Sequence, residues 1–474
     1  MPGDELSRAH PRVTLAVLSL AGLAYAVLSS AVVPALTPIQ HSLHASESGI
    51  AWILTGYLLS ASVGTAILGR LGDMYGKERV LMWTLVTLAA GTLLAAVSHT
   101  LWLLIAARVV QGVAGGIFPL AFGIVRDEFP PERVAGSIGL MSAILGIGAG
   151  AGIVAGALIV EHLAWQWLFW MPLIVIVVAA VCTWRFVPES PVRVPGRVNW
   201  LAAVLMSTGI CAVLLAISEA TAWGWGSSRM LGLLAGGLVV CGAWAIVETR
   251  SHEPLIDTTM MRIRGVWTTN LTAFLLGAGM YSSFIVFPQL AQLPRSTGFG
   301  YGASVVVSGL YLLPSTAGMF IVSFAAGRIA ARFGSKRAAV VGSAITAASF
   351  ALIAAQHAHP YDMLVSAALL GLGIGLAFSA LGNLIVQAVP AHQTGAAGGM
   401  NTVMRTIGGA IGGQISATLI SDHVGVGGFP AVTGFTDTFV MAAAFLVVCT
   451  IAGLLIPPSS RAARLPELAP AFEK

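Results

Sequence analysis

Charge is scarce in this sequence, and its scarcity excludes the usual soluble classes of protein. Only 9% of the 474 residues are Asp, Glu, Lys or Arg, whereas 57% are hydrophobic and the mean hydropathy is +0.88. A soluble domain carries about 25% charged residues. Apolar runs of about 18 residues or more are typical of membrane helices. Because such runs recur along the whole chain, a cleaved signal peptide does not explain them, and we expect an integral membrane protein.

Cysteine is also rare, and its placement excludes two further classes. The four cysteines, Cys182, Cys211, Cys241 and Cys449, all fall inside apolar runs without paired spacing. We therefore expect neither a disulfide framework nor a zinc site. The ten histidines fall in loops or at the ends of runs, which gives no metal-binding set. No Walker-type phosphate loop and no nucleophile–base pair is visible, so we expect no enzyme, no cofactor and no ATP-driven step.

Fourteen hydrophobic spans are predicted, in three groups. The first six are residues 13–36, 49–71, 79–98, 101–125, 134–160 and 165–187. Two more are residues 198–220 and 229–248. The last six are residues 265–292, 304–332, 337–356, 361–389, 395–420 and 435–457. Membrane helices tolerate the glycine and proline inside these spans. The expected fold class is an all-α integral membrane protein.

The basic residues lie on alternate connections, and this sets the expected orientation. With the N-terminus in the cytoplasm, 20 of the 24 Lys and Arg residues fall on the cytoplasmic side, as the positive-inside rule requires. Arg229 and Arg295 fall outside, while Arg108 and Arg405 lie within spans. Both termini are then cytoplasmic. Because the cations sit in short loops between apolar runs, the net charge of +5 does not indicate nucleic-acid binding.

Two internal echoes suggest a duplication. The stretch GRLGDMYGKER (69–79) aligns with GRIAARFGSKR (327–337) at an offset of 258, and GSIGLM (136–141) resembles GAAGGM (395–400) at an offset of 259. Six-helix halves with a substrate site between them are a known plan of transporters. The predicted parts are cytoplasmic ends at 1–12 and 458–474, a bundle at 13–187, inserted helices with cytoplasmic linkers at 188–264, and a second bundle at 265–457.

These motifs resemble those of the major facilitator superfamily over nearly the whole chain. GRLGDMYGKERV (69–80) is similar to its signature between helices 2 and 3, and RVVQGVAGG (108–116) to its helix-4 signature. GLMSAILGIGAGAGIVAGAL (139–158) has the glycine spacing of its antiporter signature. WILTGYLLS (52–60), WQWLFWMP (165–172) and EPLIDTTMMR (253–262) resemble the fourteen-helix drug:proton antiporter branch.

Two departures from the family pattern stand out. Ile153 occupies the position where the helix-5 signature usually has proline. Tyr25 and Ser30 occupy positions where the branch usually has an acidic residue and an asparagine in helix 1.

The resemblance implies a specific fold and activity. The fold would be two pseudo-symmetric six-helix bundles plus two inserted helices. The protein would be a monomeric multi-pass exporter in the cell membrane, moving a small amphipathic drug, antibiotic or metabolite in exchange for protons by alternating access. The alternatives are a facilitator or lipid/metabolite transporter without proton antiport, and a non-transporting membrane sensor. A sensor would carry an appended soluble domain, and we see no such stretch.

The turn after the second span holds the candidate gate. Gly69 permits close helix approach, and Gly76 permits a turn that a β-carbon would hinder. Asp73 is expected to accept hydrogen bonds from a helix N-terminus or to pair with a cation of the opposite half. The second copy of the turn has Ala331 at the matching position. For Arg79 the alternative is a solvated basic turn that only sets topology.

A glycine series in the fifth span is the second conformational candidate. Gly148, Gly152 and Gly156 recur every four residues and therefore share one helix face. Small residues at this spacing let two helix backbones approach closely. We expect this span to pack tightly on a helix of the other half.

The membrane interior holds two arginines and no deeply placed acid. A charge there costs at least ~2.5–3.5 kcal/mol on insertion scales, so it indicates function. Arg108 is expected either to be held by backbone carbonyls and Gln111 or to face an anionic substrate, and Arg405 to face a cavity. The net positive cavity favours an acidic substrate. Further candidates for the path are Tyr57, Asn270, Gln289 and Asn401, each of which could equally serve packing or an interhelical hydrogen bond.

Overall fold

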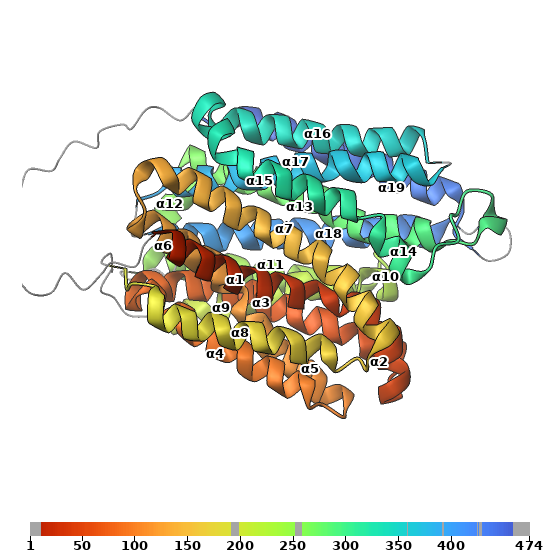
Figure 1. The fold of residues 1–474 in the computed structure, drawn as a ribbon, viewed down its shortest axis with the longest axis horizontal. Coiled ribbons are helices and arrows are strands. Elements are labelled where there is room, and N and C mark those ends of the chain that lie inside the picture. The colour runs from red at the N-terminus through yellow and green to blue at the C-terminus, as the bar shows by residue number, and fades with distance from the viewer. Residues whose placement is uncertain are drawn as a thin grey trace, which may run out of the picture.

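The computed structural model describes residues 11–190, 199–251, 258–357, 359–390, 393–423, 425 and 429–457. The predicted terminal segments 1–10 and 458–474 lie outside the described residues, as do Arg193 and Arg197. Within the described part of the chain the regular elements are helices and no strand is formed, as expected for the all-α class (Figure 1).

The helices follow the three predicted groups. The first group is α1 (Pro11–Ala31), α2 (Leu36–Leu43), α3 (Glu47–Tyr75), α4 (Lys77–Ala96), α5 (Leu101–Gly112), α6 (Ile117–Glu128), α7 (Pro131–His162) and α8 (Trp167–Phe186), with 3-10 turns η1 (Val33–Ala35) and η2 (Val113–Gly116). The middle group is α9 (Trp200–Ser218), α10 (Ala220–Trp223), α11 (Ser228–Arg250) and α12 (Thr258–Arg262). The last group is α13 (Arg264–Gln292), η3 (Arg295–Thr297), α14 (Val305–Leu310), α15 (Leu313–Phe333), α16 (Ser335–Ala355), α17 (Pro360–Ala388), α18 (Thr394–Asp422) and α19 (Val432–Leu455).

The span count agrees with the prediction only in part. Twelve helical segments within the described residues are long and apolar enough to cross a membrane. Two predicted spans do not meet that standard. The segment 304–332 contains a shorter apolar stretch, Val306–Val322. The helix α18 is long enough, but it carries Arg405, Asn401 and Gln414 among many glycines. The number fourteen is therefore not confirmed.

Two glycine turns of matching position join consecutive helices. Gly76 links α3 to α4 with φ of +106°, and Gly334 links α15 to α16 with φ of +83°. A side chain at such a φ is strained, and glycine is not. The two positions are equivalent in the sequence echo, so the same turn is built once in each group of helices. The predicted turn at Gly76 is confirmed.

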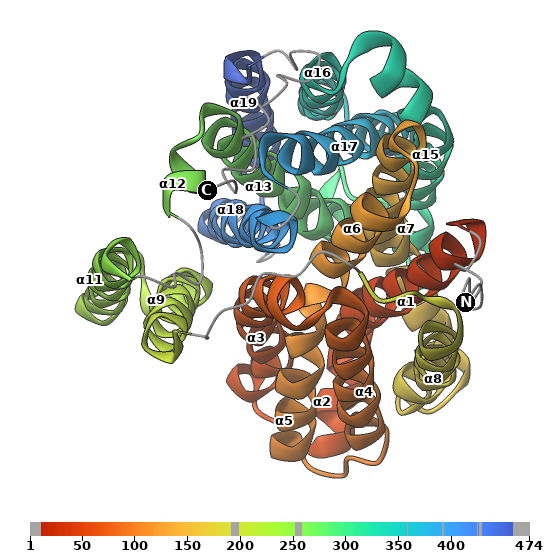
Figure 2. The same ribbon diagram turned by 90° about the vertical axis from the view of Figure 1, so that its left-hand side faces the viewer.

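Viewed along the helices, the first and last groups form two bundles (Figure 2). The pair α9 and α11 lies to one side, next to α3 and α18. Met206 and Ile210 of α9 belong to the hydrophobic core of the first bundle. At the other end of the pair, Trp225 Nε1 donates to Thr418 Oγ1 of α18 at 2.8 Å. The pair thus contacts both bundles.

The fifth span packs on a helix of the other half, as predicted, because α7 lies against α15. Its four-residue glycine series, however, packs on its own bundle. A β-carbon at Gly148 would lie 2.4 Å from Cβ of Ala26. One at Gly152 would lie 2.5 Å from the carbonyl oxygen of Val27, and one at Gly156 would lie 2.1 Å from that of Ala31. All three partners belong to α1.

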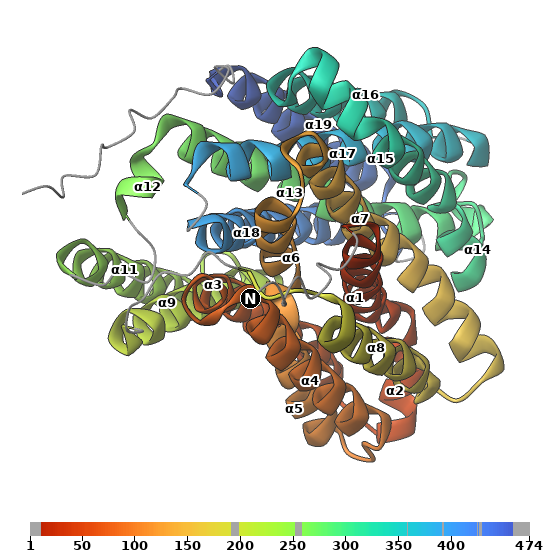
Figure 3. The ribbon, with the colours of Figure 1, turned by 60° about the vertical axis from the view of Figure 1, so that its left-hand side comes forward.

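The opposite face of α7 makes the contact with the second bundle. Gly146 touches Met319 of α15, and Gly150 touches Thr316 of α15. Figure 3 shows α7 running between α1 and α15. Residues two apart on a helix point in nearly opposite directions. The run from Gly146 to Gly152, with glycine at every second position, therefore supplies one small-residue face to each bundle.

Candidate functional site

The two sequence echoes contact each other across the interface between the bundles. A β-carbon at Gly69 of α3 would lie 2.3 Å from the carbonyl oxygen of Gly395 of α18. A β-carbon at Gly327 of α15 would lie 2.8 Å from Cα of Gly136 of α7. The turn motif of each bundle, at Gly69 or Gly327, thus contacts the second motif of the opposite bundle, at Gly395 or Gly136. We call this end of the molecule the Asp73 end.

Asp73 lies at the α3–α18 contact and is fully buried. Its Oδ1 accepts a hydrogen bond from the Gly395 amide at 3.4 Å, and its Oδ2 accepts one from the Ala396 amide at 3.2 Å. Both amides belong to the first turn of α18, where the helix dipole favours a negative charge. The geometry matches the first of the two predicted alternatives, a carboxylate at a helix N-terminus of the other half.

Lys77 connects this carboxylate to a second one. Its fully buried Nζ lies 3.5 Å from Oδ1 of Asp73 and 2.7 Å from Oδ2 of Asp127. Ser190 donates a hydrogen bond to the same oxygen of Asp127. All these residues belong to the first bundle or to the segment that follows it. The cation beside Asp73 therefore comes from its own half.

Arg126 of α6 crosses to the second bundle. Its guanidinium donates to the carbonyl oxygen of Val389 at 2.8 Å, to Thr394 Oγ1 at 2.7 Å and to the carbonyl oxygen of Pro390 at 3.4 Å. These acceptors lie between the end of α17 and the start of α18, where a cation complements the carboxyl end of a helix. We call Asp73, Lys77, Arg126 and Asp127 the Asp73 cluster.

Sequence reasoning missed Arg126, which it counted only among the cytoplasmic cations. A usable signal was present, since Phe118, Phe122 and Arg126 recur every four residues on one face of α6. Arg79, in contrast, was predicted as a gate residue and lies outside the cluster. Its side chain is 59% exposed, and its Nε lies 3.4 Å from Oε2 of Glu189.

Arg108 of α5 is buried among groups of its own bundle. It donates to Gln111 Oε1 at 2.8 Å and to the carbonyl oxygens of Leu28 and Ile53 at 3.4 Å each. Its guanidinium carbon lies 4.1 Å from the ring centroid of Tyr57, a cation–π distance. This is the arrangement in which Arg108 joins α1, α3 and α5. Its Nη2 has no hydrogen-bond partner among the described residues.

Arg405 of α18 lines a small cavity between the bundles, which we call the Arg405 cavity. The cavity is lined by Phe118, Phe122, Ser142, Leu145, Phe378, Gly382, Asn401, Thr402 and Arg405. The guanidinium lies over the ring of Phe378, 4.6 Å from its centroid. Within the described part of the chain it has no ion pair and no hydrogen bond. A cation held by a ring face alone keeps its donors free for an anion.

The remaining predicted path residues divide into three kinds. Asn401 lines the Arg405 cavity and donates to Oδ1 of Asn270 at 3.0 Å. Asn270 stands behind it on α13 and supports it. Tyr57 and Gln111 belong to the Arg108 site, where Gln111 also donates to Thr92. Gln289 is exposed and lines neither cavity.

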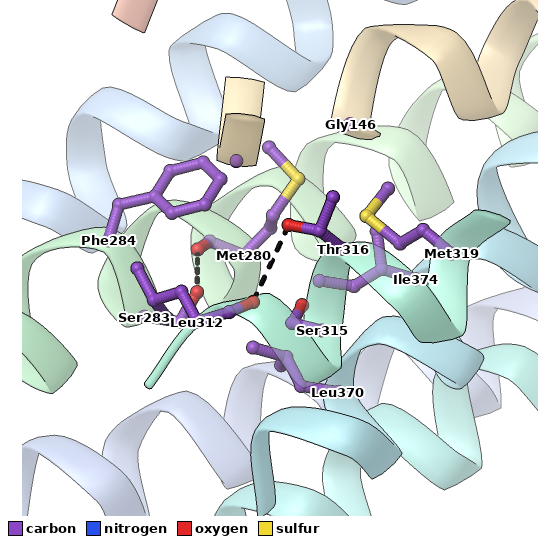
Figure 4. A pocket seen from close by; sticks show the side chains of 11 residues that line it. Gly146, Met280, Ser283, Phe284, Leu312, Ser315, Thr316, Met319, Leu370 and Ile374 are labelled. Carbon is purple, nitrogen blue, oxygen red and sulfur yellow. Dashed lines mark hydrogen bonds between the residues drawn. The ribbon is translucent and has the colours of Figure 1, made fainter. Parts of the chain in front are cut away.

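A second, small cavity lies between α7, α13, α15 and α17 (Figure 4). Its lining residues are Gly146, Gly150, Met280, Ser283, Phe284, Leu312, Ser315, Thr316, Met319, Leu370 and Ile374. We call it the Met280 cavity. None of its lining residues is charged, whereas the Arg405 cavity is lined by a cation. No group of His, Cys, Asp and Glu among the described residues is arranged to hold a metal.

A family model and several curated proteins are similar to this chain over most of its length. The Major Facilitator Superfamily model matches residues 18–413 and 269–472. The tetracenomycin C resistance and export protein of Streptomyces glaucescens is 30% identical over 426 residues, covering 88% of this chain and 77% of that protein. Multidrug resistance protein 3 of Bacillus subtilis is 26% identical over 375 residues, covering 78% of this chain and 72% of that protein.

Some relatives are longer, and the structural likeness concerns the fold alone. The chain covers 59% of an MFS-type transporter of Mycobacterium tuberculosis, to which it is 28% identical. Among solved structures, the human organic anion transporter MFSD10 matches with a TM-score of 0.68 over 94% of this chain and 99% of that chain. The identity there is 14%, so the match says nothing about the substrate of this chain.

Proposed function

The chain belongs to the drug-exporter branch of the major facilitator superfamily, and from this premise we propose that it exports small amphipathic anions in exchange for protons. Its multiple apolar helices make it a multi-pass membrane protein, and its family makes it a transporter rather than an enzyme. The relatives are named for tetracenomycin C export and multidrug resistance. From these names we infer that the substrate is a drug or an antibiotic.

The single observation that carries the anionic preference is the position of Arg405. It is 8% exposed and faces a cavity between the bundles. Its guanidinium rests on Phe378 without an acidic partner among the described residues. Burying an uncompensated cation is costly. An anionic ligand offsets this cost by forming charge-assisted hydrogen bonds with the free donors.

The proposed arrangement in the membrane has fourteen spans with both termini in the cytoplasm. Besides the twelve apolar helices, we count α15 and α18 as spans. The polar residues of α18 face other helices, since it packs on α3 and α13. Polar groups of a membrane helix are tolerated when they face protein. The bundles at 13–187 and 265–457, with the inserted segment 188–264, then form a monomeric transporter in the cell membrane.

The positive-inside distribution assigns the Asp73 end to the cytoplasm. The contacts of the Asp73 cluster then hold the cytoplasmic side closed, and the bundles must separate there for substrate to enter. Opening breaks two hydrogen bonds to Asp73 and three from Arg126. Hydrogen bonds to charged groups contribute about 1.5–3 kcal/mol each. The cluster is thus able to set the balance between the closed and open states.

Proton coupling is the part of the proposal that rests most on the family. No carboxylate lines either cavity, so the proton and the substrate do not share a ligand within the described residues. We assign the proton to the Asp73 cluster, where protonation of a carboxylate weakens its hydrogen bonds to α18. Protonation would then favour opening to the cytoplasm and deprotonation would favour closure, so a proton taken up from outside is released to the cytoplasm when that side opens.

A transport assay in proteoliposomes tests this function. Export of an anionic, a neutral and a cationic fluorescent drug is measured together with the internal pH. We expect the anion to be moved with a counterflow of protons, and Arg405→Gln to slow its export at least tenfold, equal to a loss of about 1.4 kcal/mol. The neutral drug should be affected little by that change.

The matched control is Arg250→Gln, which removes an exposed arginine at the end of α11. Equal slowing of all three drugs, or unchanged anion export, would contradict the role of Arg405. Clear export without any pH change would instead indicate a facilitator.

A further inference from the structure

The two cavities lie in series along the same helices. On α7, Leu145 lines the Arg405 cavity and the next residue, Gly146, lines the Met280 cavity. On α17, Phe378 lines the first and Ile374 the second. A step of four residues is about 6 Å along a helix. The Met280 cavity therefore begins about one turn beyond the Arg405 cavity, on the side away from the Asp73 end.

The α7 wall of the Met280 cavity is bare backbone. The methyl carbon of Met319 lies 1.7 Å from the place where a β-carbon of Gly146 would stand. Thr316 Oγ1 lies 2.1 Å from the corresponding place at Gly150. Side chains from α13, α15 and α17 form the other walls (Figure 4). The cavity is thus a recess of the second bundle, covered by a helix of the first.

Its chemistry suits a flat apolar group. Met280, Met319 and Phe284 surround the space in Figure 4. Methionine side chains adapt to different shapes and pack favourably on aromatic rings. No residue that lines the cavity is charged, so an apolar group entering it leaves no buried charge without a partner.

One hydroxyl of the cavity is free. Ser283 donates to the carbonyl oxygen of Met280 at 2.6 Å, and Thr316 donates to that of Leu312 at 3.5 Å. The hydroxyl of Ser315 has no hydrogen bond within the described residues, and Figure 4 shows it at the edge of the same space. A free hydroxyl in an apolar recess can donate to a ligand oxygen, for which a carbonyl is the simplest acceptor.

We propose that the Met280 cavity, once the bundles separate and α7 uncovers it, is a second subsite that takes the flat, carbonyl-bearing ring system of an aromatic acid whose carboxylate lies at Arg405. Ser315 donates to the ring carbonyl. The subsite deepens the proposed function and rests on it only for the carboxylate end. Leu370 and Gly382 mark the far limits of the two cavities on α17. They lie about 18 Å apart along the helix, so only an elongated molecule occupies both.

The test uses three radiolabelled probes and the full chain in nanodiscs, with empty nanodiscs as the blank. Anthraquinone-2-carboxylate has the ring system and the acid, benzoate has the acid with one ring, and anthraquinone has the ring system alone. Ser315→Leu fills the Met280 cavity, Ser315→Ala removes only the hydroxyl, and Arg405→Gln removes the anion partner. Ser207→Leu makes the same change on α9, away from both cavities, and serves as the control.

We expect Ser315→Leu to weaken the binding of anthraquinone-2-carboxylate and of anthraquinone at least tenfold and to leave the binding of benzoate unchanged. Ser315→Ala should weaken the binding of the two probes that carry the ring system about threefold to tenfold, the effect of one neutral hydrogen bond. Unchanged benzoate binding also shows that the variants are folded.

Three results would overturn the subsite. They are failure of anthraquinone-2-carboxylate to bind the unaltered protein, its unchanged binding to Ser315→Leu, and an equal loss of benzoate in that variant. The anionic function fails separately, if Arg405→Gln leaves both acids unchanged. In that case the neutral anthraquinone still reports on the subsite.

Discussion

At the scale of single residues, two opposite charges of the first bundle meet two helix ends of the second. Asp73 accepts from the first amides of α18, and Arg126 donates to the carbonyl oxygens of Val389 and Pro390, directly after α17. Each charge has the sign that the helix dipole at its site favours. The contact therefore stabilises one relative position of the bundles, because the hydrogen bonds are lost as soon as the helix ends move away.

Asp73→Asn tests this contact while it preserves the size of the side chain. We expect the cytoplasmic side to open more often, so that a cysteine at Ser142 in the Arg405 cavity reacts about tenfold faster with a membrane-impermeant maleimide added from the cytoplasm. Drug export should fall while the amount of protein in the membrane persists. Glu132→Gln, an exposed acid at the same end, is the control. Equal labelling of both variants would reduce Asp73 to a packing role.

The sequence made Asp73 recognisable and left Arg126 hidden, for a physical reason. Asp73 is an acid that the second copy of its own motif lacks, and that comparison needs no structure. The partners of Arg126 lie more than 260 positions away in the chain. Arg79 shows the converse. It belongs to the same sequence motif as Asp73, but its side chain points to Glu189 and solvent.

At the scale of helices, glycine spacing predicts that a face packs closely but not which helix it packs on. The span that α7 forms was expected to pack on the other half and does so, but its four-residue glycine series lies against α1. The interface contact uses glycines two positions earlier, on the other face. A single helix that serves two partners shows two interleaved series, and only the three-dimensional arrangement assigns each series to its neighbour.

Alanine substitutions separate the two kinds of glycine contact. At Gly69 the added carbon would meet the Gly395 backbone of the other bundle, and at Gly152 it would meet the Val27 backbone of its own bundle. Overpacking costs about 1–3 kcal/mol. We expect Gly69→Ala to increase cytoplasmic labelling of a cysteine at Ser142 with little change in melting temperature, and Gly152→Ala to lower the melting temperature by several degrees. Gly232→Ala, which has nothing within 4 Å, should change neither, and a reversed pattern would contradict the assignment.

At the scale of the whole molecule, composition predicts most of the architecture because a membrane selects for it. The predicted apolar runs coincide with helices to within a few residues, since water is excluded from the bilayer core and the backbone must bond to itself. The exception is instructive. Helix α18, predicted as the span 395–420, is too polar to meet the apolar standard of a membrane helix. It is the helix that carries Arg405, donates to Asp73 and accepts from Trp225 of the inserted pair. A span that faces protein on all sides loses the apolar signal that lipid contact imposes.

The fourteen-span arrangement makes a direct prediction about the two helices that hydropathy leaves in doubt. If α15 spans, a single cysteine at Ser296 before it reacts with an impermeant maleimide from outside intact cells, and one at Arg337 after it reacts only once the cytoplasmic face is accessible. If α18 spans, a cysteine at Ser421 also reacts from outside.

All three positions are exposed, and the protein with its native cysteines alone is the blank. Labelling of Ser296 and Arg337 from the same side would remove α15 from the spans, and labelling of Ser421 only from the cytoplasm would remove α18. Either result would mean that the interface holding the Asp73 cluster and the Arg405 cavity does not cross the membrane. Alternating access through this interface would then be untenable.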